Sequence, residues 1–317
     1  MYNSVHRFFI STPLLAVMQD GIAASASLKM GAECYPLGEF FYQTLFLRMT
    51  GAQEQKMKCL CWEMATNDYT YRYEYLHNKN YGECSTYADK CGIYKDIVGL
   101  IKKLSSDFKV FQIWDDVSLD EATVLAERAK WEKKVNNNRK KQIAKNIEVQ
   151  ENKKGANLSQ DAKDKIEASI MGKPLPEDDY AEHLAGVKKH KAVSELVSKV
   201  CRCIKNSNIV IWKEHDFCEF TDNWGKKIKG DQVTPKDASL LGSQLQKFYE
   251  NVVYVHRNRC AHNTSSYQQN LPTLSTLASK EILEQNYFYR FALLIIIDEV
   301  FLRLYKRYVE LKEKWEE

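Results

Sequence analysis

Proline and glycine are scarce in this chain, whose 317 residues include 6 prolines and 13 glycines. Loop-rich and all-β proteins need these residues for their turns, so the scarcity argues against both classes. Hydrophobic residues make up 44% of the chain, which is enough for a core and argues against disorder. The composition therefore predicts a folded protein that is mostly α-helical.

Paired cysteines are lacking as well, and the one strongly apolar segment near the C-terminus is interrupted. The nine cysteines are odd in number and include no CxxC pair, so we expect reduced thiols, as in the cytoplasm, and no zinc site. The apolar segment at residues 291–305 is broken by Asp298 and Glu299 before it reaches the roughly 20 residues that a bilayer span needs. We expect a core helix there and no membrane anchor.

The N-terminal 25 residues have a basic start, an apolar middle and small residues at the end, which are features of a signal peptide. A Ser-Thr-Pro string at residues 11–13 interrupts the apolar middle, however. A capping hydroxyl followed by proline in the first turn is typical of a helix start. We therefore predict a helix that begins at this string and runs from Leu14 to about Met30.

Apolar residues recur at three- and four-residue steps from Leu37 to Leu76, and this spacing predicts a helix that is long or bends near Gly51. Aromatic side chains crowd the same region. We interpret them as core packing with a partly exposed tyrosine face, and a platform for stacking nucleic-acid bases is the alternative.

The next stretch is expected to hold a helix at residues 93–104 and then a short extended piece at residues 109–116. Ser118 and Glu121 follow with the spacing of a capping box, which predicts the start of another helix.

Charge distinguishes the region that follows. Between Glu127 and Lys154 there are ten Lys or Arg residues and four Glu, and apolar residues are too few for a buried helix. Two interpretations stay open: a solvated helix or mobile arm, and an arm that grips phosphates. The net charge of the whole chain, +4, is compatible with a polyanionic partner without requiring one. Two prolines within residues 171–180 predict a hinge.

These changes in composition divide the chain into three parts. Residues 1–117 form an N-terminal helical region that is either a sensor or part of the main bundle. Residues 118–180 form a charged helical arm and hinge, and residues 181–317 form a C-terminal helical domain.

Three elements are expected between residue 181 and the motif described next. Residues 182–205 have the pattern of an amphipathic helix, and residues 208–220 have the β-branched and aromatic bias of a strand or extended connector. Thr234 and Pro235 are expected to open a further helix. Its apolar stripe comprises Leu240, Leu241, Leu245, Phe248, Val252 and Val255. A final long helix is predicted from about residue 280 to residue 314.

The string R-N-x-x-x-H, formed by Arg257, Asn258 and His262, ends the apolar stripe. On a helix, Asn258 and His262 share a face and Arg257 lies one step around, so the three side chains can converge on one small anion. Arginine holds a phosphodiester with paired donors, and histidine moves protons near neutral pH. The motif is therefore a candidate phosphate site and a candidate catalytic site.

This string resembles the catalytic motif of the HEPN superfamily of small all-α ribonucleases. "RNRCAHN" followed by "NLP" at residues 270–272 is similar to the motif region of its Abi-like (abortive-infection) branch, and the same string recurs in type VI CRISPR effector nucleases. The resemblance covers residues 234–315. It implies a HEPN-like helical bundle, to which this chain adds N-terminal helices and the long charged arm.

The resemblance also implies an activity. HEPN ribonucleases cleave RNA without metal or other cofactor, by attack of the ribose 2′-hydroxyl that leaves a cyclic phosphate and a 5′-hydroxyl. Carried over, Arg257 binds the scissile phosphate, Asn258 orients it or the histidine, and His262 is the general acid or base. Two motifs usually meet across a dimer in this family, and the single copy here implies a homodimer with a composite site.

Neighbouring residues have two interpretations each. His256 and Arg259 alternate with the motif and either touch substrate or are solvated neighbours. Tyr254 and Tyr267 either stack a base or pack against the helix end. Cys260 is expected to face the core and not to act as a nucleophile.

The sequence thus predicts a cytoplasmic homodimeric endoribonuclease of prokaryotic anti-phage defence or toxin type, which acts on RNA and answers to a regulatory partner or phage trigger. One alternative is a non-catalytic HEPN-like module that binds nucleotides or a protein partner. Another makes the N-terminal region a sensor of phage or nucleic acid that controls the C-terminal part.

Overall fold

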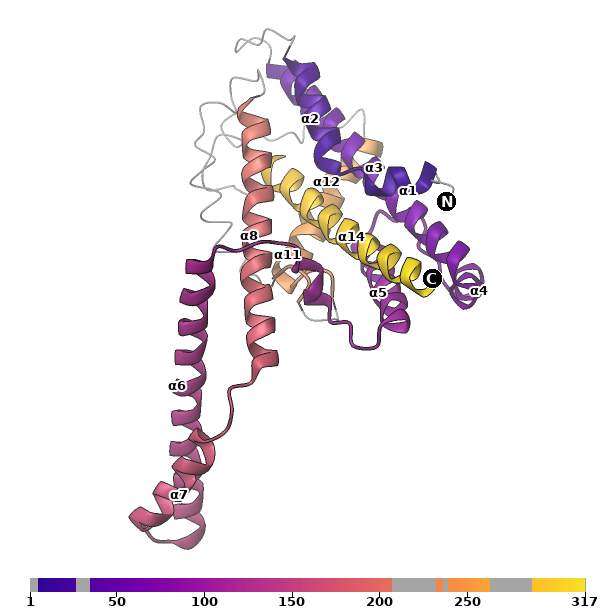
Figure 1. Cartoon of the computed structure of the whole chain (residues 1–317). Coiled ribbons are helices and arrows are strands. Elements are labelled where there is room, and N and C mark those ends of the chain that lie inside the picture. The colour runs from indigo at the N-terminus through magenta and orange to yellow at the C-terminus, as the bar shows by residue number, and fades with distance from the viewer. Residues whose placement is uncertain (1–4, 27–34, 207–231, 236–238, 263–286, 317) are drawn as a thin grey trace. The chain divides into compact units, whose positions relative to one another are not determined.

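The computed structural model describes residues 5–26, 35–206, 232–235, 239–262 and 287–316 (Figure 1). The chain is mostly α-helical, as its composition predicts. It divides into two compact units, and each is described by itself. The body comprises Met1–Trp114 and Lys189–Glu317, and the arm comprises Asp115–Lys188. The sequence places the arm at residues 118–180, and the body groups the N-terminal region with the C-terminal one.

Helices α1 (Val5–Ser11) and α2 (Leu14–Ser25) meet at the Ser-Thr-Pro string, where a helix start is predicted. The predicted hydroxyl cap is wrong. Thr12 donates its hydroxyl to the carbonyl of Phe8 instead, and the first amide of α2, on Leu14, donates to the carboxylate of Asp298 at 2.6 Å. A side chain from the far end of the chain therefore caps this helix.

Helix α3 (Tyr35–Asn67) is long and continues as a helix through Gly51. The chain breaks later, at Asp68, whose carboxylate accepts a hydrogen bond from the Tyr71 amide at 2.7 Å and so caps α4 (Tyr69–His77). Tyr71 is buried and Tyr69 is exposed, in keeping with the expected mixture of core and surface tyrosines.

Helix α5 (Tyr87–Leu104) begins six residues before the predicted start, because Thr86 and Asp89 form a capping box. The predicted extended piece is wrong: Val110–Trp114 forms the 3₁₀ helix η2. Its three-residue turn places Val110 and Ile113 on one buried face, and a 3₁₀ helix therefore satisfies the apolar pattern that suggested a strand.

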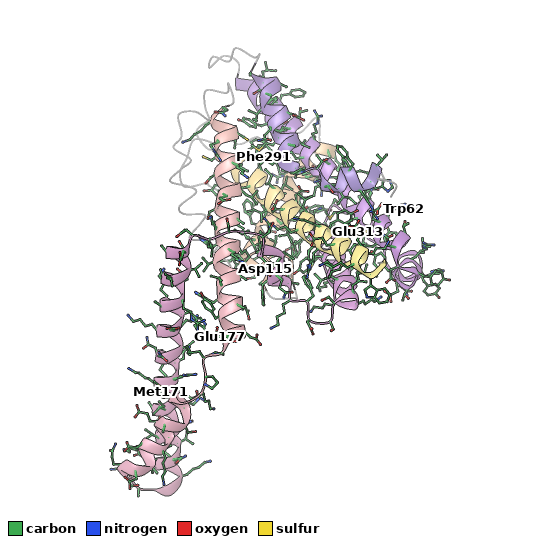
Figure 2. The ribbon with its side chains drawn as sticks, viewed as in Figure 1. Trp62, Asp115, Met171, Glu177, Phe291 and Glu313 are labelled. Atoms are coloured by element: carbon green, nitrogen blue, oxygen red, sulfur yellow. The ribbon has the colours of Figure 1, made fainter. Side chains whose placement is uncertain are left out.

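Helix α14 (Tyr287–Glu316), yellow in Figure 1, is the central helix of the body and contacts α2, α3, α5 and η2. Residues 291–297 are buried throughout, which confirms the predicted core helix, and Figure 2 shows Phe291 among the side chains of the body. Asp298 is buried too. It pairs with Lys56 of α3 at 2.7 Å in addition to capping α2.

The arm contains α6 (Glu121–Lys154), α7 (Gln160–Met171) and the first residues of α8 (Glu177–Lys205). Asp120, and not Ser118, caps α6, because its carboxylate accepts from the Thr123 amide at 2.8 Å. Gly155 ends α6 with a left-handed φ of 64°. Helix α7 then packs against α6, and the proline-containing connection to α8 runs from Met171 to Glu177, both labelled in Figure 2.

Two arginines of α6 hold the arm together. The guanidinium of Arg128 lies 5.0 Å from the Trp131 ring and 4.4 Å from the Tyr180 ring, and it donates to both carboxylate oxygens of Glu177 at 2.7 Å. Arg139 donates to backbone carbonyls of the connection between α7 and α8. These basic side chains are therefore structural.

The helix predicted to open at Thr234 and Pro235 begins later. Thr234 has a positive φ of 46° and lies in a turn that is closed by an antiparallel bridge between Val233 and Leu241. Helix α11 starts only at Ser243. The predicted amphipathic helix at residues 182–205 is confirmed by α8, and residues 208–220, with their predicted strand, lie outside the described residues.

Length and apolar composition decide whether a helix can cross a bilayer. No single described helix is both long and apolar enough to cross a bilayer, and only α1 and α2 together, which meet at a bend of 74°, have sufficient length and apolar composition.

Candidate active site

The R-N-x-x-x-H string lies on α12 (Val255–His262), which continues α11 (Ser243–Phe248) through the π-helical segment η5 (Tyr249–Tyr254). The π segment changes which residues face inward. Leu245, Tyr249 and Val253 are buried, whereas Val255 of the predicted stripe is exposed. A π turn contains more residues than an α turn, so the three buried residues, which are four positions apart, stay on one side of the helix. The wider turn also changes the direction in which the side chains of the following motif point.

Arg257 forms a two-point ion pair with Glu54 of α3. Its Nε and Nη2 atoms each donate to one carboxylate oxygen, and both N···O distances are 3.1 Å. The side chains are largely buried, with 20% of Arg257 and 13% of Glu54 exposed. Paired donors on a planar carboxylate fix the guanidinium in orientation as well as position.

Asn258 completes the surroundings of this guanidinium. Nη1 of Arg257 donates to the Asn258 side-chain oxygen at 3.2 Å. A guanidinium has five N–H groups, and these three bonds use one on each nitrogen. Among the described residues these are its bonds, which leave one N–H on Nη1 and one on Nη2 as a pair of donors for an oxyanion.

Lys90 of α5 is a second cation in the same electrostatic environment. It is buried, its ammonium donates to the Cys84 carbonyl at 2.6 Å, and it lies 5.5 Å from the centre of the Tyr249 ring. Burial lowers the pKa of Lys90 to about 8, while the carboxylate of Glu54 opposes that shift and Arg257 adds to it. Glu54 is therefore the counter-charge for two cations.

His262 is the last residue of α12 and is exposed. It stands four positions after Asn258 on the helix, the spacing that places both on one face. Within the part of the chain that the structure describes, no hydrogen bond joins His262 to Arg257 or Asn258. The structure thus brings Arg257 and Asn258 into contact and leaves the imidazole of His262 in solvent.

His256 points into the body. Its ring lies 5.0 Å from the Phe46 ring, and its Nε2 atom is 3.1 Å from the Tyr287 hydroxyl and 3.4 Å from the Cys260 thiol. Burial, with Arg290 and Arg259 adding to it, holds the pKa of His256 far below its ordinary value, so the ring is neutral. Nε2 is a hydrogen-bond partner of both the hydroxyl and the thiol, as donor or acceptor according to the tautomer of the ring. His256 is therefore a packing residue. Cys260 contacts the same ring nitrogen through its thiol.

The other sequence candidates are dispersed. Arg259 is exposed and Tyr254 is half-buried. Tyr267 and the "NLP" string at residues 270–272 lie outside the described residues.

Sequence reasoning missed Glu54 and Lys90. Glu54 is separated from Arg257 by 203 positions, and Lys90 lies on a third helix. Glu54 lies among other polar residues, Gln53, Gln55 and Lys56, so nothing in the sequence pattern distinguishes it or identifies its partner.

The described residues contain no group of three or more His, Cys, Asp or Glu side chains placed to hold a metal ion. Comparison of the chain with protein-family models, with curated proteins and with solved structures found no match.

Proposed function

We propose that this chain is a metal-independent endoribonuclease whose site comprises Arg257, Asn258 and His262. One observation carries the proposal: α12 presents a guanidinium fixed by Glu54 beside an asparagine amide, with a solvent-exposed imidazole on the same helix. The guanidinium and the amide would bind and orient the phosphate of the RNA. The imidazole would transfer the proton, for which it must be accessible to the RNA.

The proposed reaction requires no group beyond these side chains and the RNA. A base takes the proton of the ribose 2′-hydroxyl, the oxygen forms a bond to the adjacent phosphorus, and the bond from phosphorus to the 5′-oxygen breaks. The 5′-oxygen receives a proton, which leaves a 2′,3′-cyclic phosphate and a 5′-hydroxyl. The two remaining N–H groups of Arg257 would hold the phosphate oxygens, and His262 would take or give the proton.

A homodimer with a composite site is part of the proposal. The reaction needs both a proton acceptor and a proton donor, whereas each chain supplies one motif histidine. His262 is exposed at the last residue of α12, and a second copy of the chain would bring the second histidine. A role in prokaryotic anti-phage defence or as a toxin, in the cytoplasm and under a regulatory partner or phage trigger, rests on the motif resemblance alone.

The test is cleavage of end-labelled tRNA and of a long single-stranded RNA by the purified full chain in EDTA. We expect Arg257→Ala and His262→Ala each to lower the cleavage rate by at least about 100-fold. Arg202→Ala and His77→Ala are the matched controls, because both side chains are exposed on other helices of the body. Mass spectrometry of the products should find cyclic-phosphate ends.

A second function is favoured by the ion pair itself. An arginine that is held on both sides by carboxylate and amide also suits a non-catalytic module that binds a nucleotide or a partner. Nucleotide binding that is lost in Arg257→Ala, with no cleavage by the wild type even in extract of phage-infected cells, would establish this function and refute the nuclease.

A further inference from the structure

Six lysines lie on one side of α6. At about 100° per residue, their positions fall within an arc of about 140° around the helix. All six side chains are exposed. This lysine face comprises Lys130, Lys133, Lys134, Lys140, Lys141 and Lys145.

The opposite side of α6 is the packed side of the arm. It carries the buried Trp131 and Ile143 and the two arginines that fasten the arm, Arg128 and Arg139. The one acidic residue between Lys130 and Lys145, Glu132, also lies on that side and bonds Arg128 at 2.7 Å. Between Lys134 and Lys145 the lysine face therefore carries no carboxylate, whereas Glu127 and Glu148 lie on the same face at its two ends.

Most of these lysines form no ion pair with the described residues of the arm. Lys130 pairs with Glu127 at 2.6 Å, but the other five have no acidic partner among the described residues of the arm. Two pairs at i,i+4, Lys130 with Lys134 and Lys141 with Lys145, repel each other and destabilise the helix. A bound polyanion would relieve that repulsion.

The charge is segregated and does not simply reflect a basic composition. The arm as a whole contains 14 Lys or Arg and 15 Asp or Glu. A nearly neutral arm that concentrates lysines on one side of one helix presents a directed electrostatic surface.

The dimensions of the lysine face fit a nucleic-acid backbone. From Lys130 to Lys145 the helix rises about 22 Å, and a duplex carries about one negative charge per 1.7 Å of its axis. Lysine is a point charge that neutralises phosphates without reading sequence. Asn137 and Asn138, between the lysines, add donors of the kind that bind phosphate and sugar oxygens.

A membrane surface fits less well. Basic helices that lie on bilayers place large apolar or aromatic side chains beside their lysines. Between Lys134 and Lys145, Asn137 and Ala144 share the lysine face and Asn138 lies at its edge. We infer that the lysine face of α6 is a docking surface for the phosphate backbone of nucleic acid. The inference uses no residue of α12, so it stands even if the chain cleaves nothing.

The experiment measures binding of the full chain, in EDTA and with His262→Ala in every protein so that cleavage does not interfere. Fluorescence anisotropy is recorded with an RNA duplex and a DNA duplex of about 20 base pairs, which are longer than the lysine face, over a series of salt concentrations. The test variant changes Lys133, Lys134, Lys140, Lys141 and Lys145 to Glu. The control changes the same net charge at exposed lysines elsewhere, namely Lys95, Lys165, Lys199, Lys306 and Lys314.

We expect the test variant to lose at least 10-fold in affinity near 0.1 M salt and to flatten the plot of log affinity against log salt by roughly 3 units, since each phosphate contact contributes about 0.9. The control should keep the wild-type slope. Binding of both duplexes assigns the surface to any backbone, whereas binding of the RNA duplex alone assigns it to A-form geometry.

Three outcomes would overturn the inference: no binding of either duplex by the wild type, equal affinity and slope in the test variant, or binding only to vesicles of phosphatidylserine. If the Glu variant loses helix content by circular dichroism, the same five lysines are changed to Gln, which favours helices and removes the charge. The Gln variant is expected to lose affinity in the same direction.

Discussion

The guanidinium of Arg257 and the carboxylate of Glu54 meet at two N···O distances of 3.1 Å across 203 positions of sequence. This pair joins the motif helix α12 to α3. Under the proposed function, a phosphate at Arg257 would meet a guanidinium that is already oriented, and it would bind through the two N–H groups that Glu54 and Asn258 leave unused.

The first prediction concerns the strength of that pair. A double-mutant cycle of Glu54→Gln and Arg257→Gln should give a coupling free energy of about 1–3 kcal/mol in urea unfolding, because the pair is largely desolvated and two-pronged. The pair Arg307 and Glu310 on α14, at 3.7 Å and with 35% and 45% of the side chains exposed, is the control and should couple by less than about 0.5 kcal/mol. Equal coupling in both cycles would mean that Glu54 does not fix Arg257.

The second prediction uses the buried ammonium of Lys90. Its pKa is about 8 in the folded body, against an unfolded value of 10.5. Between these values the unfolded chain binds more protons than the folded chain, so the free energy of unfolding should rise as pH increases from 8 to 10.5.

Urea unfolding at pH 7.5, 8.5 and 9.5 measures this rise. In Lys90→Met, which keeps the buried stem and removes the charge, the rise should be smaller by as much as about 1 kcal/mol per pH unit. Lys95→Met is the control, because Lys95 is exposed on the same helix. Parallel pH profiles for the wild type and Lys90→Met would show that the ammonium is not desolvated.

The third prediction is the acid-side counterpart and concerns His256. The pKa of His256 in the folded chain is far below its ordinary value. Below about pH 6.5, His256 therefore binds a proton in the unfolded chain but stays unprotonated in the folded chain. Stability should therefore fall as the pH drops from 6.5, by at most about 1.4 kcal/mol per unit from this residue.

His256→Phe should lose that part of the pH dependence while keeping the ring contact with Phe46. The measurement is the urea midpoint at several pH values between 4.5 and 7. The matched variant His77→Phe, at an exposed position, is expected to leave the profile unchanged. A profile unchanged in His256→Phe as well would place the His256 ring in water.

Periodicity predicted the long helices because burial on one face leaves a mark in the sequence. The apolar residues of α14 and the amphipathic pattern of α8 are read directly in this way. Helix starts were less accessible. Ser118 has the right spacing for a cap, but Asp120 makes the bond, and α2 takes its cap from Asp298 at the other end of the chain.

The site was predictable only along its own helix. The sequence supplies Arg257, Asn258 and His262 as neighbours, whereas the contact with Glu54 depends on how α3 packs against α12. From its position next to the motif, His256 was expected to contact substrate or solvent, whereas its ring packs against Phe46 in the body. The π segment before α12 alters the register, and local pattern reasoning assumes a regular helix.

Asp298 has a consequence for how the chain acquires its shape. Its carboxylate joins Leu14, Lys56 and the last helix, so the early helices receive a cap and a counter-ion only after α14 has been synthesised. During translation, α2 and α3 lack their contacts with α14, and Lys56 lacks its carboxylate partner, until α14 has been made. The arm, in contrast, is complete once residue 188 has been added. The nascent body thus completes the cap of α2 and the ion pair of Lys56 only when α14 is present.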